Sequence, residues 1–166
     1  MLKKLLLPIF LFFVFNVLAQ DKITTFILIR HAEKAMEQST NDPDLSAAGK
    51  KRAQRLADLL NEGEVSAIYS TPYKRTRQTV EPLAVKKGLT VLDYEINKEE
   101  EVDKMIAAYA GGTIVVVGHS NTIPWMANTL LGVQKYYPWE DGDYDNVWVI
   151  TVVEKGKSAK LLWLNY

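Results

Sequence analysis

Short, almost wholly apolar runs that alternate with helix-like segments constrain the fold of this chain more than any other feature. The runs are Thr24–Ile29, Ala67–Tyr69 and Thr113–Val117. Continuous apolar runs of this length predict strands that are buried on both faces, as in a parallel sheet covered by helices. The alternation therefore predicts an α/β protein with a mostly parallel central sheet.

Three segments between these runs carry apolar residues at helical spacing. They are Ser46–Leu60, with Ser46 as a credible N-cap, Thr76–Lys87 and Glu99–Ala110. Near the C-terminus, two further apolar segments flank the turn Lys155-Gly156-Lys157. This spacing predicts an antiparallel hairpin formed by residues 147–153 and 159–164.

The first nineteen residues have the features of a secretory signal peptide. Lys3 and Lys4 precede the apolar run Leu5–Leu18, and small residues before Gln20 suit cleavage there. The run is shorter than the ~20 apolar residues of a membrane span, so an uncleaved N-terminal anchor is the weaker interpretation. We expect residues 20–166 to form one domain that is secreted or periplasmic, with no membrane attachment after cleavage.

The composition excludes several classes of function. Twenty basic residues balance twenty acidic ones, so no basic excess indicates nucleic-acid binding. The chain has no cysteine, and therefore no disulfide and no thiolate nucleophile. Only two histidines are present, so the chain has few imidazole ligands for a catalytic metal ion.

Both histidines directly follow a predicted strand: His31 comes after the first apolar run and Arg30, and His119 comes after the third run and Gly118. The carboxyl ends of strands in an open α/β sheet form the edge at which ligands bind. A hydrogen-bonded structural role is the alternative for each imidazole taken singly. Two histidines at equivalent strand ends favour a functional site.

Arginines gather at the same edge. Arg30 adjoins His31, and a cluster that includes Lys74, Arg75 and Arg77 follows the second strand. Guanidinium groups match phosphate oxygens with paired donors, so the pattern predicts a phosphate pocket. A solvated helix start is the alternative for the cluster, although cations are disfavoured in a first helical turn unless an anion is present.

Four motifs on these elements resemble those of a known family. They are Arg30-His31-Ala32-Glu33, Leu45-Ser46-Ala47-Ala48-Gly49, Ser70 through Thr79, and Gly118-His119-Ser120. In this order they resemble the histidine phosphatase superfamily, the phosphoglycerate-mutase-like proteins, and in particular its short phosphohistidine-phosphatase branch. The resemblance implies a three-layer α/β/α sandwich.

The resemblance also implies roles for individual residues. His31 would be the nucleophile that takes the phosphoryl group, and Arg30, Arg75 and His119 would surround it. These three and Ser120 would bind the substrate, a phosphorylated small molecule or a phosphoprotein. Neither a metal nor a cofactor is implied.

The general acid is the open question. Many relatives with acid-phosphatase activity carry Asp directly after the second histidine, where this chain has Ser120. Asp93, Glu95 and Glu33 are the remaining candidates, and Glu33 has the competing role of orienting His31 or Lys34. Without an acid, substrates with good leaving groups, such as phosphohistidine or acyl phosphates, would be favoured.

The sequence also indicates how open the pocket is and which segment lies at its rim. The span between Gly88 and Gly112 is too short for a cap insertion, so the pocket should be open. The aromatic and acidic segment 134–145 is expected to cover the rim with Tyr136, Tyr137 and Trp139 facing the substrate, or to form a plain surface loop.

Other functional classes fit the residues less well. A metal hydrolase would have only His31, Glu33 and His119 as ligands. A serine hydrolase built on Ser120 lacks the final glycine of the nucleophile elbow and a later histidine. A mutase would need a primed phosphoenzyme, and a catalytically silent phosphate-binding module remains the main alternative to a hydrolase.

Overall fold

The structure, a computed structural model, describes residues 22–37 and 39–166. The predicted signal peptide, residues 1–19, lies outside the described residues. The strands are β1 (Thr24–Arg30), β2 (Ala67–Ser70), β3 (Val91–Asp93), β4 (Thr113–Gly118), β5 (Asn146–Glu154) and β6 (Ser158–Asn165). The helices are α1 (Ala47–Leu59), α2 (Lys74–Lys87), α3 (Glu99–Ala108) and α4 (Thr122–Leu131).

The six strands form one mixed sheet in the order β3-β2-β4-β1-β5-β6. The first four strands along the chain are parallel, and β5 and β6 form an antiparallel hairpin beside β1. The prediction of an α/β fold with a mostly parallel sheet and a C-terminal hairpin is therefore confirmed. β1 and β4 are neighbours although more than eighty residues separate them, because three helical crossovers, through α1, α2 and α3, lie between them.

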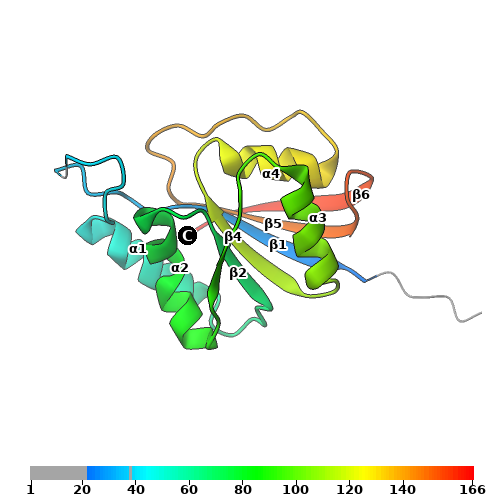
Figure 1. The fold of residues 1–166 in the computed structure, drawn as a ribbon, viewed down its shortest axis with the longest axis horizontal. Coiled ribbons are helices and arrows are strands. Elements are labelled where there is room, and N and C mark those ends of the chain that lie inside the picture. Colours follow the sequence, from blue (N-terminus) through cyan, green and yellow to red (C-terminus); the bar gives the residue numbers. More distant parts are fainter. Residues whose placement is uncertain (1–21, 38) are drawn as a thin grey trace, which may run out of the picture.

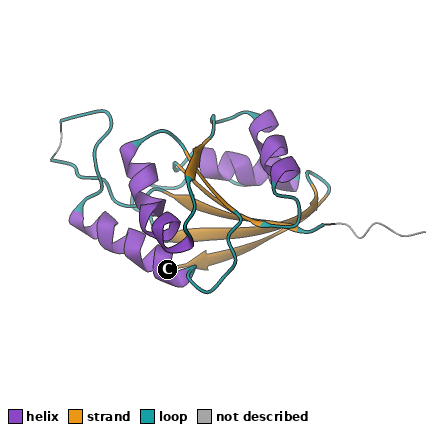
Figure 2. Cartoon of the chain, turned by 60° about the horizontal axis from the view of Figure 1, so that its bottom comes forward, coloured by secondary structure: helices purple, strands orange, loops and turns teal. Residues whose placement is uncertain are grey.

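Helices cover both faces of the sheet, with α1 and α2 on one side and α3 and α4 on the other (Figures 1 and 2). Alternation along β1 explains the two cores. Phe26 and Leu28 pack with α3 and α4, whereas Ile27 and Ile29 pack with α1 and α2. Because both faces need apolar side chains, the strand is an unbroken apolar run and not an alternating one.

The predicted strands and the first three helices are confirmed, with small shifts at their ends. The most useful shift is at α2, which begins at Lys74 and so places Arg75 in its first turn. β3 and α4 were not predicted: β3 has only three residues, and seven of the ten residues of α4 are buried, so it lacks the polar stripe that marks an amphipathic helix. Within residues 22–37 and 39–166, no helix is long and apolar enough to cross a membrane.

The start of α1 is fixed against the loop that follows β1. Ser46 caps the helix, as predicted, by accepting a hydrogen bond from the backbone N–H of Gly49 at 3.1 Å. The backbone N–H of Ser46 donates to the carbonyl oxygen of Glu33 at 2.9 Å. A Cβ atom on Gly49 would lie 2.2 Å from that same oxygen. The glycine of this motif thus permits a helix to touch the backbone beside the first histidine.

Replacement of Gly49 by Ala tests this contact. Helix propensity alone would stabilise the protein by ~1 kcal/mol, because alanine is the better helix former. We expect destabilisation by about 1–3 kcal/mol instead, because backbone atoms must separate to admit the methyl group. Urea unfolding measures the change, and Gly63→Ala is the control, since an added Cβ there meets nothing closer than 4.0 Å. Equal stability of the two variants would contradict the proposed contact.

Candidate active site

The candidate site lies at the carboxyl edge of three neighbouring strands, β2, β4 and β1. Arg30 pairs in register with Gly118, and the backbone N–H of His31 donates to the carbonyl oxygen of Gly118 at 2.9 Å. The chain leaves β1 toward α1 on one face of the sheet and leaves β4 toward α4 on the other (Figure 1). A crevice forms where the connections that follow two neighbouring strands run to opposite faces of the sheet, as in other open α/β sheets.

His31 is 5% exposed, and a hydrogen bond fixes its ring. Its Nδ1 lies 2.8 Å from the carbonyl oxygen of Ala32, and since that oxygen only accepts, Nδ1 carries the proton. Burial lowers the pKa of His31 to about 3. The positive charges of Arg75 and Arg30 act in the same direction, while the bond to Ala32 opposes them. At neutral pH the ring is therefore uncharged, with a free lone pair on Nε2.

His119 faces His31 edge to face, with 5.5 Å between the ring centroids. Its Nε2 lies 3.0 Å from the hydroxyl oxygen of Thr71, and its backbone N–H donates to the hydroxyl of Thr122 at 2.9 Å. Burial, together with the positive charges of Arg75 and Arg30, lowers the pKa of His119 to about 4. The site thus contains two neutral imidazoles beside cations.

Arg30 is buried beneath the loop that precedes β5. Its Nη1 donates to the carbonyl oxygens of Glu140 at 2.6 Å and Asp143 at 3.1 Å. The ring of Tyr144 covers the guanidinium at 4.3 Å, and the buried Nε has no hydrogen-bond partner among the described residues. Neutral carbonyls and an aromatic face hold Arg30 in place without neutralising its charge.

Arg75 approaches the same place from the first turn of α2. Its guanidinium lies 4.5 Å from the centre of the Tyr73 ring, and Nη1 lies 3.5 Å from a carboxylate oxygen of Asp42. The same oxygen accepts from the backbone N–H of Lys74 at 3.0 Å, so Asp42 also caps this helix. Arg77, two residues later, is exposed and pairs with Asp93.

One cavity of about 330 Å³ is lined by all five predicted residues: Arg30, His31, Arg75, His119 and Ser120. The guanidinium groups supply positive charge, and the imidazoles supply one nucleophilic nitrogen and further hydrogen bonding. This arrangement suits a tetrahedral oxyanion such as phosphate. Lys34 and Tyr73 also line the cavity.

The three residues considered as general acids do not line this cavity. The carboxylate of Glu33 receives bonds of 2.8–3.0 Å from Arg52, so the expectation that it orients His31 or Lys34 is wrong. Burial opposes ionisation of Glu33, but the bonds from Arg52 outweigh it and lower the pKa. Asp93 is paired with Arg77, and Glu95 pairs with Lys98 at 2.5 Å.

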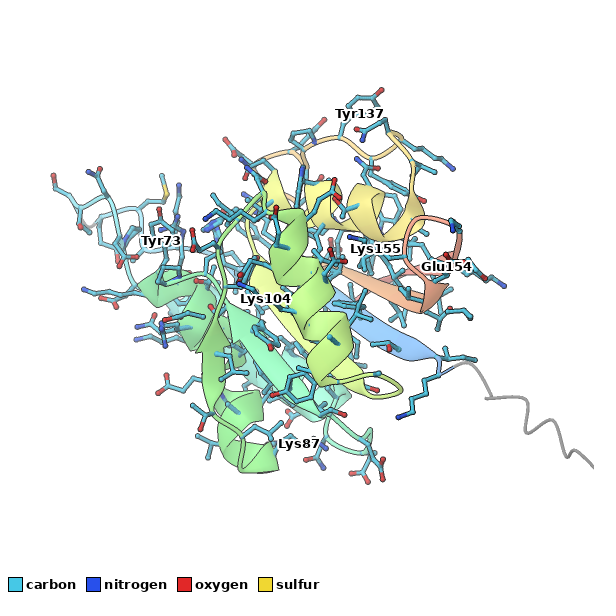
Figure 3. All side chains as sticks on the ribbon, turned by 45° about the vertical axis from the view of Figure 1, so that its right-hand side comes forward. Tyr73, Lys87, Lys104, Tyr137, Glu154 and Lys155 are labelled. Atoms are coloured by element: carbon cyan, nitrogen blue, oxygen red, sulfur yellow. The ribbon has the colours of Figure 1, made fainter. Side chains whose placement is uncertain are left out.

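The segment 134–145 does reach the rim, but through other side chains than expected. Tyr136 and Trp139 pack on Trp148, with ring centroids 4.9 and 4.7 Å apart, so the expectation that they face the substrate is wrong. Tyr137 is 76% exposed and lies at the outer edge of the molecule (Figure 3). Tyr144, on Arg30, and Asp141, on the cavity wall, are the members of this segment at the site.

Several residues of the site were not found from the sequence. Thr71, Tyr73 and Tyr144 have no chemistry that marks them singly, and Asp42 lies in a loop more than thirty residues from Arg75. Thr71 and Tyr73 do fall inside the motif that contains Arg75, which was the available signal. Across the described residues, no group of three or more His, Cys, Asp or Glu side chains is placed to hold a metal ion.

The fold and the site together define an α/β sandwich with a cationic, two-histidine anion pocket at the edge of its sheet. The family model of the histidine phosphatase superfamily (branch 1) matches residues 26–99, which include His31 and Arg75. The chain is 44% identical over 71 residues to phosphoserine phosphatase 1 of Hydrogenobacter thermophilus. That match covers 40% of this chain and 34% of the relative, about a third of its length.

Solved structures share the fold over most of the chain. A mycobacterial glucosyl-3-phosphoglycerate phosphatase is similar with a TM-score of 0.69 and 15% identity, over 87% of this chain and 99% of that one. The protein histidine phosphatase SixA in complex with tungstate also gives 0.69 and 15%, over 85% and 96%. The family match confirms the resemblance to the histidine phosphatase superfamily over residues 26–99, and these likenesses confirm the three-layer fold.

The depressed histidine pKa predicts how stability depends on pH. Below pH ~6.5 the unfolded chain protonates His31, whereas the folded protein keeps it neutral until about pH 3. Protons therefore favour the unfolded state in this window, and lowering the pH from 7 to 5 should remove roughly 1–2 kcal/mol of stability through His31. Urea unfolding of His31→Gln at both pH values should show a smaller loss than the natural chain. An equal loss would mean that this imidazole is charged in the folded protein.

Proposed function

We propose that this protein is a phosphatase that hydrolyses phosphoric monoesters or phosphohistidine through a phosphohistidine intermediate on His31. One observation carries the proposal: a buried, neutral imidazole presents its free Nε2 in a cavity that it shares with Arg30, Arg75 and His119. A neutral nitrogen attacks phosphorus directly, and the cations offset the charge of the phosphoryl oxygens.

The first step transfers the phosphoryl group to the protein. The Nε2 lone pair of His31 forms a bond to phosphorus while the bond from phosphorus to the leaving group breaks with its electron pair. The hydrogen bond from Nδ1 to Ala32 keeps the reactive tautomer and stabilises the positive charge that develops on the ring. Water then attacks phosphorus in the second step, and the P–N bond breaks to return the electron pair to Nε2.

The cationic groups act on the phosphoryl oxygens in both steps. Arg30 and Arg75 approach from different elements, β1 and α2, so together they can hold more than one oxygen. Loss of one preorganised donor in sites of this kind raises the barrier by ~3 kcal/mol. His119, whose Nε2 lies 3.0 Å from the hydroxyl oxygen of Thr71, also lines the cavity and can contact the phosphoryl group.

The matched proteins support the reaction class but leave the substrate open. Their names include a phosphoserine phosphatase, a glucosyl-3-phosphoglycerate phosphatase and a protein histidine phosphatase. We propose a phosphorylated small molecule or phosphoprotein as substrate, with no metal or cofactor. From the sequence of residues 1–19 we also propose that the protein acts in a secreted or periplasmic location.

The phosphoenzyme is the test of this proposal. Brief incubation with 4-nitrophenyl phosphate, followed by denaturation and mass spectrometry, should locate an acid-labile, base-stable phosphoryl group on His31. His31→Ala should give no adduct and no turnover. A hydroxylamine-sensitive adduct would indicate an acyl phosphate on a carboxylate, and binding of phosphate with no adduct or turnover would indicate a silent phosphate-binding module.

Two arginines of α2 provide the matched control. Arg75→Ala should slow adduct formation about 100-fold, in line with the loss of one preorganised donor. Arg77→Ala, which removes the same group two residues away, should change the rate less than about twofold, because Arg77 is exposed and pairs with Asp93 outside the cavity. Equal effects of the two variants would show that general surface charge, and not the pocket, promotes the reaction.

A further inference from the structure

We propose that Asp141 is the proton donor to the leaving group and the proton acceptor from the attacking water. The proposal rests on the proposed phosphatase function and deepens it. The acid candidates drawn from the sequence are all directed elsewhere, and among the described residues that line the cavity, Asp141 is the one carboxylate. It belongs to the segment after α4, far in sequence from the motifs that contain the histidines and arginines.

The loop that carries Asp141 is fixed in place from several sides. The backbone N–H of Trp139 donates to the carbonyl oxygen of Ser120 at 3.0 Å, which ties the loop to the residue after His119. Within the loop, the N–H of Asp143 donates to the carbonyl oxygen of Glu140 at 3.1 Å, and the N–H of Glu140 donates to a carboxylate oxygen of Asp143 at 3.3 Å. Asp141 thus sits at the tip of a closed turn.

Arg30 connects this turn to the phosphate pocket. Its Nη1 binds the carbonyl oxygens on both sides of Asp141, those of Glu140 and Asp143. Its Nη2 lies 3.9 Å from a carboxylate oxygen of Asp141 itself. The guanidinium that would hold the phosphoryl group therefore also holds the carboxyl group beside it. Asp141 also lines the cavity, so we expect the bridging ester oxygen of a substrate whose phosphoryl group is held by Arg30 to lie near its carboxyl group.

The carboxyl group of Asp141 is also able to exchange a proton with the solvent. Apart from the long contact to Arg30, it has no hydrogen-bond or ion-pair partner among the residues that the structure describes, and it is exposed to solvent. Glu33, Asp93 and Glu95 differ in this respect, since each is bound to a cation. A proton donor must be both within reach of the reacting oxygen and able to exchange its proton with water.

Asp141 gives up one proton in the first step of the reaction and regains one in the second. In the first, His31 takes the phosphoryl group, and the Asp141 carboxyl gives its proton to the departing oxygen, which leaves as an alcohol. In the second, the Asp141 carboxylate takes a proton from water as the water oxygen bonds to phosphorus, and the P–N bond breaks. Phosphate departs, and both side chains return to their starting forms.

Leaving groups of different basicity isolate this role. An alkoxide needs a proton as it leaves, whereas 4-nitrophenolate does not. In Asp141→Asn, kcat/KM for phosphoserine and glycerol 2-phosphate should fall by about 100-fold or more, in the range expected for loss of a general acid. For 4-nitrophenyl phosphate, kcat/KM should fall less than about threefold. Its kcat should drop with a burst of nitrophenolate, because hydrolysis of the phosphoenzyme has lost its base.

Asp145→Asn is the matched control, since it removes one negative charge from the same segment outside the cavity. This variant should have the same kcat/KM for alkyl and aryl substrates as the natural protein, and it should not acquire the burst that is expected of Asp141→Asn. Equal losses of kcat/KM for aryl and alkyl substrates in Asp141→Asn would overturn the proposal, because they indicate a merely structural role. Faster turnover of all substrates would also overturn it, because Asp141 would then be a competing anion on Arg30. Natural protein with no activity on alkyl esters would show that no acid operates.

These outcomes are separable from failure of the proposed function. If the natural protein forms the His31 adduct from 4-nitrophenyl phosphate but Asp141→Asn shows no dependence on the leaving group, the role of Asp141 alone is wrong. If no adduct forms in the natural protein, the proposed function itself is wrong, and Asp141 has no reaction to serve.

Discussion

The hydrogen bond from Nδ1 of His31 to the carbonyl oxygen of Ala32 governs the chemistry of this site. It settles which ring nitrogen carries the proton and leaves Nε2 as the nucleophilic atom. Burial then keeps the ring neutral, because a charged imidazole would lose its hydration beside two arginines. The backbone of His31 is fixed at the end of β1 by the hydrogen bond from its N–H to the carbonyl oxygen of Gly118 in β4.

The surroundings of the arginines preserve their charge for a ligand. A close carboxylate pair would compete with phosphate, but Arg30 is held mainly by carbonyl oxygens and by the face of Tyr144, and its contact with the carboxylate of Asp141 is long at 3.9 Å. Arg75 lies on the face of Tyr73, and its one carboxylate contact, to Asp42, is long at 3.5 Å. The aromatic rings orient the guanidinium groups while leaving donor nitrogens unpaired. The cavity therefore keeps positive charge at its floor without a ligand.

Local sequence signals were sufficient for five of the six strands and for the residues at the carboxyl edge of the sheet, but not for the three-residue β3. The first and third apolar runs end two residues before a histidine, so position along the strand determines where His31 and His119 lie. The partners of side chains could not be predicted in the same way. Glu33 pairs with Arg52 because α1 folds back on the loop after β1, and Trp139 packs on Trp148 because the final loop returns to the sheet. Such contacts depend on tertiary packing and not on local pattern.

The central claim is that the free imidazole of His31 is neutral with its proton on Nδ1. Nitrogen-15 NMR of histidine-labelled protein at pH 7 tests it directly, since protonated and unprotonated ring nitrogens resonate far apart, and His119→Gln assigns the two rings. We expect the His31 spectrum to show a protonated Nδ1 and an unprotonated Nε2. A proton on Nε2, or an imidazolium with both nitrogens protonated, would contradict the account.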